Sequence, residues 1–216
     1  MRIQAKINEF RYPILIGSDL LKILPKEITR LTNSKKILIL MDKNLSKKYK
    51  IKMQKIFDSK GFESSFFIVT AGKKCKDIKN LIKIVGTLEK RKFSKDSTLI
   101  VFGGGTIGDL GGFAASVYYR GLNLVSIPTT LTAQIDSSIG GKVATNFNNN
   151  VNAMGNYYHP KLIICDYLFI KTLPKRDFIS GMAEVIKSVL ITPSPKSIYL
   201  LVSISIAKGL YSIIQE

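Results

Sequence analysis

The hydrophobic positions in the first hundred residues follow two spacings in turn. Continuous apolar runs occupy 36–41 and 97–102, and such runs are typical of strands that are buried on both faces of a parallel sheet. Between them, apolar residues recur at helical spacing over 45–60 and 77–91, which indicates amphipathic helices. This alternation of strand and helix predicts an α/β fold with a doubly wound, largely parallel sheet.

Other elements are predicted from shorter signals. Ser18 is a candidate N-cap for a helix that runs to about Leu31. The remaining predicted elements are strands at 2–7, 14–16, 66–69, 122–127 and 162–165, and a helix over 174–191.

The composition is that of a globular protein, with 45% hydrophobic and 22% charged residues, a balance that allows a core to be buried. The net charge is +18, which favours an anionic substrate. The basic residues extend from Lys6 to Lys208 and many lie at helical spacing, so we expect solvated helix faces and no nucleic-acid partner. A basic nucleic-acid binder is the alternative, and salt-dependent binding would reveal it.

Three observations bear on the compartment. Cys75 and Cys165 have no metal-ligand spacing, and free thiols suit a reducing cytoplasm. The first residues lack the apolar stretch of a signal peptide, and no run reaches the roughly 18 apolar residues of a membrane span. We therefore expect a cytoplasmic protein without a membrane partner.

The most informative local motif is GGGTIGD at 103–109, which follows the apolar run 97–102 and opens a helical pattern. Glycines allow a tight turn whose N–H groups can approach a phosphate, and a helix N-terminus adds partial positive charge. The spacing differs from that of the usual dinucleotide fingerprint. A phosphate site is expected here, with a glycine-rich turn that binds nothing as the alternative.

Two polar blocks come next. The hydroxyls of Thr129 and Thr130 follow the strand predicted at 122–127 and can bond a phosphate or a ribose, or else cap a helix. The block QIDSSIGGK at 134–142 predicts a polar pocket, because so many polar side chains cannot be buried without partners. Its Lys142 resembles an anion-binding lysine, although the block is not a Walker P-loop.

Towards the end of the chain, GMAEVIK at 181–187 places Glu184 and Lys187 on one helix face. They form either a surface ion pair or a buried carboxylate that needs a metal or a cation. His159 is the only histidine and is expected to be structural or exposed.

In this order, these blocks resemble the sugar-phosphate cyclases and are most similar to the dehydroquinate synthase family. The resemblance runs from about residue 2 to residue 191. The segments that carry it are GGGTIGDLGGF at 103–113, YRG at 119–121, PTTLTAQIDSSIGGK at 128–142, KTLP at 171–174 and GMAEVIK at 181–187.

The resemblance implies an α/β NAD-binding domain over 1–173, followed by the start of an α-helical domain over 174–216. It also implies a carbon–oxygen lyase of the shikimate pathway, which leads to the aromatic amino acids. That enzyme converts 3-deoxy-arabino-heptulosonate 7-phosphate to 3-dehydroquinate and phosphate with catalytic NAD and a divalent metal, zinc or cobalt. The resemblance further implies a homodimer.

Individual roles are implied in the same way. NAD contacts are implied for Asp42, Asn44, Gly72, Lys76, Gly105, Thr106, Ile107, Gly108, Asp109, Thr129, Thr130, Lys142, Phe169, Ile170, Lys171, Thr172 and Leu173. Catalytic or substrate contacts are implied for Arg120, Asp136, Lys142, Asn152 and Lys187. Arg120 would reach the substrate phosphate in the neighbouring subunit, and Glu184 would be a metal ligand.

The sequence departs from the family in three places. Lys73 replaces an acidic residue, and Val151 replaces a lysine that could bond negative charge. From about Thr192 the resemblance ends, and no histidine follows His159, whereas the family takes two histidine metal ligands from its second domain. We therefore expect a truncated chain that binds NAD weakly, holds no metal and is impaired or inactive. The alternatives are another cyclase, such as an inosose synthase, and a non-catalytic NAD-binding remnant.

Overall fold

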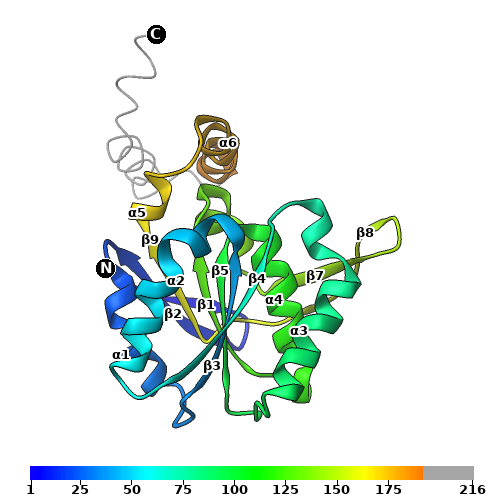
Figure 1. Cartoon of the computed structure of the whole chain (residues 1–216). Coiled ribbons are helices and arrows are strands. Elements are labelled where there is room, and N and C mark those ends of the chain that lie inside the picture. Colours follow the sequence, from blue (N-terminus) through cyan, green and yellow to red (C-terminus); the bar gives the residue numbers. More distant parts are fainter. Residues whose placement is uncertain (192–216) are drawn as a thin grey trace.

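The computed structural model describes residues 1–191, apart from the side chain of Lys73. At its centre is a seven-stranded sheet with the order β1-β2-β9-β6-β5-β3-β4 (Figure 1). Only the hairpin of β1 and β2 is antiparallel, and the other neighbours pair in parallel. The strands are β1 (Arg2–Ile7), β2 (Phe10–Gly17), β3 (Lys36–Asp42), β4 (Glu63–Val69), β5 (Thr98–Gly103), β6 (Asn123–Pro128) and β9 (Leu162–Asp166). The predicted α/β fold with a largely parallel sheet is confirmed.

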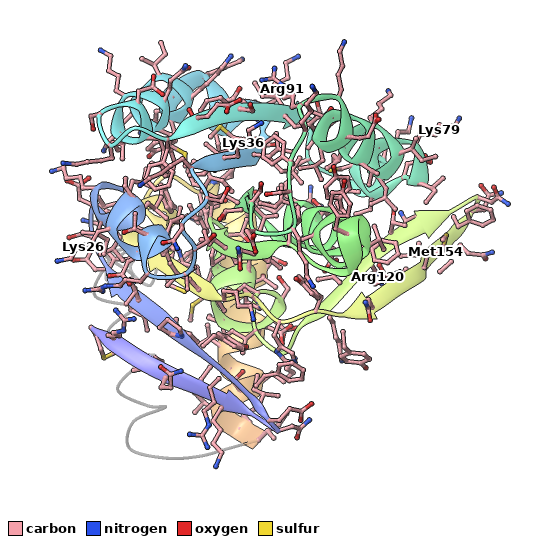
Figure 2. All side chains as sticks on the ribbon, turned by 90° about the horizontal axis from the view of Figure 1, so that it is seen from below. Lys26, Lys36, Lys79, Arg91, Arg120 and Met154 are labelled. Atoms are coloured by element: carbon pink, nitrogen blue, oxygen red, sulfur yellow. The ribbon has the colours of Figure 1, made fainter. Side chains whose placement is uncertain are left out.

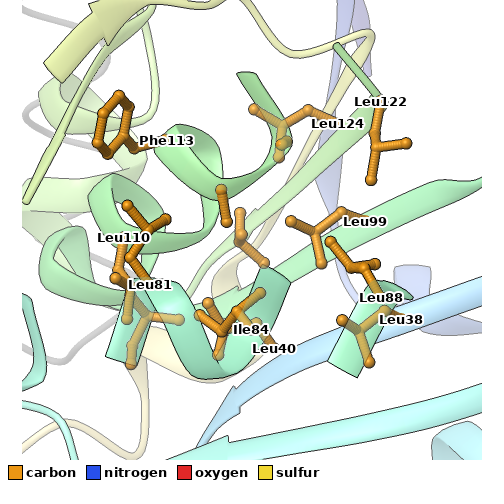
Figure 3. Close-up of a cluster of buried hydrophobic side chains, with 14 of the residues drawn as sticks. Leu38, Leu40, Leu81, Ile84, Leu88, Leu99, Leu110, Phe113, Leu122 and Leu124 are labelled. Atoms are coloured by element: carbon orange, nitrogen blue, oxygen red, sulfur yellow. The ribbon is translucent and has the colours of Figure 1, made fainter. Parts of the chain in front are cut away.

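Helices cover both faces of the sheet. Alternate residues of a strand point to opposite sides, so one strand contributes apolar side chains to both faces. Ile37 and Ile39 of β3 pack in one core with α1 (Leu24–Thr29) and α2 (Lys43–Asp58). Leu38 and Leu40 pack in the other, which is shown in Figure 3, with α3 (Ile78–Lys90) and α4 (Gly105–Val117). These four strand residues are fully buried, as the continuous apolar run predicted.

One prediction near the N-terminus was wrong, and one predicted strand is longer than expected. Ser18 caps no helix. A 3-10 turn, η1 (Leu20–Ile23), comes first, and Leu20 donates its N–H to Asp166 Oδ2 at 2.8 Å. The α-helix α1 begins later with Pro25 in its first turn, a position where the missing N–H of proline costs nothing. The second strand is also longer than the predicted 14–16. Pro13 lies inside β2 but pairs only with β1, since pairing with β9 starts at Ile14.

A β-hairpin was missed by the sequence reading. Strands β7 (Lys142–Phe147) and β8 (Asn150–Tyr157) pair antiparallel and project from the sheet (Figure 1). Asn148, in the connecting turn, has a left-handed backbone with φ 53°, which asparagine tolerates and two-residue hairpin turns require. All of β8 is exposed, whereas Val143 and Thr145 of β7 are buried.

The chain continues from β9 through a short helix, α5 (Tyr167–Ile170), into α6 (Lys175–Ile191), so the helix predicted over 174–191 is confirmed. Phe178 and Val185 of α6 pack on Leu131 and Ile170. Two 3-10 turns, η2 (Lys73–Lys76) and η3 (Tyr118–Arg120), and a π-helical turn, η4 (Ala133–Ser137), complete the elements.

None of the helices within residues 1–191 has the length and apolar character needed to cross a membrane. The change of character expected from Thr192 onwards lies outside the described residues.

Candidate functional site

The carboxyl ends of β5 and β6 form the floor of the candidate site. Gly103 pairs with Pro128 at the last position of the two strands, and the Thr129 N–H donates to the Gly103 carbonyl at 3.0 Å. Thr129 is only 5% exposed. In open α/β sheets, ligands bind beyond the carboxyl ends of the strands, so the motif predicted to hold a phosphate lies where such a ligand is expected.

The N-terminus of α4 is open towards this floor. Its N-cap is Gly104, which has no side chain to cap the helix. Ile107 and Gly108 donate their N–H groups to the Gly104 carbonyl at 3.0 and 3.1 Å. The N–H groups of Gly105 and Thr106 are those that the helix itself leaves without an acceptor, and they point along the positive end of the helix dipole.

Glycine is required here by close packing. A Cβ atom on Gly105 would lie 2.8 Å from Ser137 Oγ, and one on Gly104 would lie 3.0 Å from Thr130 Cγ2. On Gly103 it would lie 2.7 Å from Ile107 Cγ1, and Ile107 is itself fully buried in the core. The turn is therefore a cradle of bare backbone, and its shape and free N–H groups fit the pyrophosphate of a dinucleotide.

Gln134 connects the ends of two strands, a role that the sequence reading missed. Its amide nitrogen donates to the carbonyls of Pro128 and Asp166, both at 3.0 Å, so it joins the ends of β6 and β9. Next to it, Thr130 Oγ1 accepts the Ala133 N–H at 3.2 Å. Thr130 therefore caps the helical turn that follows it, which is one of the two roles expected for this residue. A glutamine four residues after the second of two strand-terminal threonines was the available signal.

Lys76, Asp109 and Asn152 form one network, although they come from three different segments. The Lys76 ammonium lies 2.5 Å from Asp109 Oδ2 and also donates to Asn152 Oδ1. Its side chain is 8% exposed and that of Asp109 is 24% exposed. Burial raises the pKa of Asp109, and the bond from Lys76 opposes that rise without cancelling it. The resemblance implied all three residues, and the structure brings them together at the first turns of α4.

A second group lies between α6 and η4. Lys187 forms an ion pair with Glu184, whose side chain is 30% exposed. The pKa of Lys187 is raised, mainly by its bond to Glu184. Desolvation opposes this rise, and the charges of Glu184 and Asp136 add to it. Glu184, the expected metal ligand, therefore lies close to Asp136 and Lys187, two expected substrate residues. Glu184 is partly buried beside a cation.

The polar pocket expected around the block at 134–142 is present in part. The hydroxyls of Ser137 and Ser138 are buried without a hydrogen-bond partner among the described residues, and with Gly108 and Ser126 they line a small cavity. Lys142 is exposed at the start of β7. It follows Gly140 and Gly141, which have φ values of 92° and 75°, a turn that glycine adopts without strain.

Some implied residues have structural roles in this chain. Asp42 caps α2, accepting the N–H groups of Asn44 at 2.8 Å and Ala71 at 2.9 Å. Phe169 is 3% exposed and lies in an aromatic cluster, 5.1 Å from Phe102 between ring centroids. Asn44, Gly72, Lys171 and Thr172 are exposed, Leu173 is half-buried and Ile170 is buried.

Arg120 lies far from the glycine-rich turn along α4. It lies in η3, beyond the end of α4 that is opposite to Gly105, and its backbone is left-handed with φ 61°. Thirteen residues of α-helix span about 20 Å at 1.5 Å per residue. Arg120 is exposed, and Figure 2 places it on the side of the molecule that carries Met154 of β8. It therefore lies at the end of α4 away from the glycine-rich turn.

The donor set for a metal is incomplete in this part of the chain. Across residues 1–191, no three His, Cys, Asp or Glu side chains are grouped so that they could hold a metal ion. A catalytic zinc usually has three protein ligands. Glu184 by itself does not fit that requirement.

Comparisons with known proteins point to one family. Residues 66–180 match the family model described as 3-dehydroquinate synthase N-terminal. The chain is 39% identical over 185 residues to the 3-dehydroquinate synthase of Clostridium acetobutylicum, covering 86% of this chain and 52% of that protein. It is 41% identical to the 3-dehydroquinate synthase of Clostridium beijerinckii, with 85% and 52% covered.

The chain belongs to the dehydroquinate synthase family. It spans about half the length of the curated relatives that it matches. Solved structures agree on the fold of this family member: a 2-deoxy-scyllo-inosose synthase complexed with carbaglucose-6-phosphate, NAD+ and Co2+ matches with a TM-score of 0.83 at 22% identity, covering 90% of this chain and 53% of that one.

A 2-epi-5-epi-valiolone synthase from Streptomyces hygroscopicus with NAD+ and Zn2+ bound matches with a TM-score of 0.75 at 26% identity, covering 85% of this chain and 50% of that one. NAD and a divalent metal were therefore present in related structures.

Proposed function

We propose that this chain carries the NAD-binding part of a 3-dehydroquinate synthase. The observation that carries the proposal is the uncapped, glycine-lined N-terminus of α4, with the Lys76–Asp109 pair beside its second turn. The pyrophosphate of NAD would accept the N–H groups of Gly105 and Thr106. Thr129, at the end of the neighbouring strand, would contact the same ligand. The relatives named 3-dehydroquinate synthase support the assignment.

The substrate of the proposed reaction is 3-deoxy-arabino-heptulosonate 7-phosphate, which yields 3-dehydroquinate and phosphate in a carbon–oxygen lyase reaction of the shikimate pathway. When bound, NAD supplies reversible hydride transfer. The chain's own residues bind and orient the substrate. Lys142 would bind an anionic group, and Asn152 would bond a hydroxyl. Asp136 and Lys187 face the same region from η4 and α6.

Arg120 would act in a neighbouring subunit of a homodimer. Its exposure and its distance from Gly105 along α4 support this role, because an exposed cation at that end of the helix is available to a neighbouring subunit. We further propose that the protein works in the cytoplasm. Neither a membrane nor a nucleic acid is proposed as a partner, and Figure 2 shows Lys26, Lys36 and Lys79 spread over different elements.

A second candidate is another sugar-phosphate cyclase of the inosose synthase type. The TM-score of 0.83 to a 2-deoxy-scyllo-inosose synthase favours it. The identity of about 40% to 3-dehydroquinate synthases, against 22% for that structure, favours the first candidate. Assays with the two substrates side by side would separate them.

We expect low or absent turnover from this chain. Its residues 1–191 offer one implied metal ligand, Glu184, and no group of three possible ligands. Val151 stands in β8 where the family has a lysine, and it is 69% exposed. A phosphate-release assay coupled to detection of 3-dehydroquinate tests this expectation. Turnover at an ordinary enzymatic rate that is lost in Lys142→Ala would overturn it.

Calorimetry with millimolar NAD tests whether the chain binds this cofactor. Binding is expected for the wild-type chain, and it should be lost in Gly105→Ala, because the new methyl group lies 2.8 Å from Ser137 Oγ and fills the cradle. The matched control is Gly86→Ala in α3, where a Cβ atom meets nothing within 4 Å. A folded wild-type chain that releases no heat of binding contradicts the proposal.

A further inference from the structure

The side chain of Thr145 is fully buried in β7, and its hydroxyl donates a hydrogen bond to the Lys76 carbonyl. One residue further along each segment, Asn146 forms a parallel bridge with Asp77. The hairpin is therefore attached at two successive positions to the segment that carries Lys76. Neither the resemblance nor the implied site residues give Thr145 a role.

The same hairpin also contacts the side-chain ammonium of Lys76. The Lys76 ammonium donates to Asn152 Oδ1 on β8 and lies 2.5 Å from Asp109. Asn152 has a left-handed backbone with φ 55°, and its N–H donates to Asn146 Oδ1 at 2.9 Å. The backbone and the ammonium of one lysine are thus fixed by two strands of one hairpin.

We propose that Thr145 is a positioning residue, whose hydroxyl fixes the Lys76 backbone so that the ammonium is directed at Asp109. Lys76 is 6% exposed, so removal of the Thr145 hydroxyl would leave the buried Lys76 carbonyl without that hydrogen-bond donor. A buried carbonyl that loses its donor carries a desolvation penalty. The segment would shift to recover a partner, and the ammonium would move with it. The inference rests on the proposed NAD site only in taking Lys76 and Asp109 as cofactor contacts.

The test compares two substitutions of Thr145. Thr145→Val removes the hydroxyl and keeps the shape, and Thr145→Ser keeps the hydroxyl. The control is Thr98→Val in β5: Thr98 is also fully buried, but its hydroxyl has no hydrogen-bond partner within the described residues. If Thr145→Val does not fold, Thr145→Ala takes its place in the same comparison.

The first readout does not depend on NAD. The Asp109 carboxyl is titrated by carbon-13 NMR, since a nearby ammonium lowers its pKa. In Thr145→Val, Asp109 should titrate at higher pH than in the wild type, whereas Thr145→Ser and Thr98→Val should match the wild type. An unchanged Asp109 titration in Thr145→Val, or an equal change in Thr145→Ser, overturns the inference.

The second readout is the dissociation constant for NAD. Thr145→Val should weaken binding roughly tenfold, as expected when about one charge-assisted contact is misplaced, and Thr145→Ser should remain within about twofold of wild type. If the wild type binds no NAD but the Asp109 titrations follow the expected pattern, the proposed function fails and the positioning of Lys76 stands. If NAD binds equally well to Thr145→Val and wild type, the positioning role for the cofactor is wrong while the proposed function stands.

Discussion

Asp166 accepts a hydrogen bond from the Leu20 N–H at 2.8 Å, although the two residues are 146 positions apart in the chain. The other carboxylate oxygen accepts the Leu168 N–H at 3.0 Å. Asp166 is 1% exposed. A single carboxylate at the end of β9 therefore caps α5 and fixes the start of η1, which connects the N-terminal hairpin to the floor of the candidate site.

Asp166→Ala should lower the free energy of unfolding by about 2–4 kcal/mol, because two partly buried N–H groups lose a charged acceptor. Asp166→Asn keeps one oxygen acceptor and should cost roughly half as much. Urea denaturation measures both. A change below about 0.5 kcal/mol in Asp166→Ala would show that solvent or another group replaces the carboxylate.

Two glycines of α4 should respond in opposite ways to alanine. A Cβ atom on Gly111 would lie 2.2 Å from Val101 Cγ1 and 2.7 Å from Leu40 Cδ2, whereas one on Gly108 meets nothing within 4 Å. Gly111→Ala should destabilise by about 1–3 kcal/mol through overpacking against the sheet. Gly108→Ala should stabilise by up to about 1 kcal/mol through helix propensity. Thermal unfolding of both variants checks the prediction, and an equal effect of the two would refute the close packing of α4 on β5.

The sheet was predictable because its central strands are buried on both faces and therefore appear as continuous apolar runs. Lys36–Asp42 and Thr98–Gly103 are the clearest cases. The start of η1 was not predictable, because its first N–H is bonded by Asp166, which lies far away in the sequence. Ser18 is close in sequence but makes no cap, and local spacing cannot reveal a long-range acceptor.

The candidate site could be predicted only in part, for a similar reason. The glycine cradle at 103–105 is local, and its motif indicated both the turn and the helix that follows. The network of Lys76, Asp109 and Asn152 joins segments that only the fold brings together. The hairpin that carries Asn152 was missed because β8 is exposed over its whole length, so its apolar and polar positions do not alternate. The paired asparagines of its turn were the available signal.

The carboxyl of Asp109 should make stability depend on pH. Its pKa in the folded protein is raised above 3.8, mainly because the group is buried. A raised acid pKa means that the folded state binds its proton more tightly than the unfolded state, so this contribution is fully present below pH 3.8 and is lost as pH rises through the folded pKa. Urea denaturation at closely spaced pH values should show this loss in the wild type. This pH-dependent loss of stability should be absent in Asp109→Asn. A parallel pH dependence in both proteins would contradict its assignment to Asp109.

The donors that residues 1–191 offer predict a low zinc content. Glu184 is in contact with Lys187. Burial raises the pKa of the Cys75 thiol to about 11 and that of Cys165 to about 12, so neither is a thiolate at neutral pH, the form that binds metal. His159 is stacked on Phe10 with 4.2 Å between ring centroids.

Because these groups do not converge on one point, the purified 216-residue chain should retain far less than one zinc per molecule after dialysis against a zinc-containing buffer and then a metal-free one. Elemental analysis measures the content, and Glu184→Ala is the matched variant. The two proteins should give the same low value, since a single carboxylate binds zinc too weakly to survive dialysis when catalytic sites use three protein ligands. One zinc per wild-type chain, lost in Glu184→Ala, would show that ligands from outside the described residues complete the site, and the expectation of an impaired enzyme would then be wrong as well.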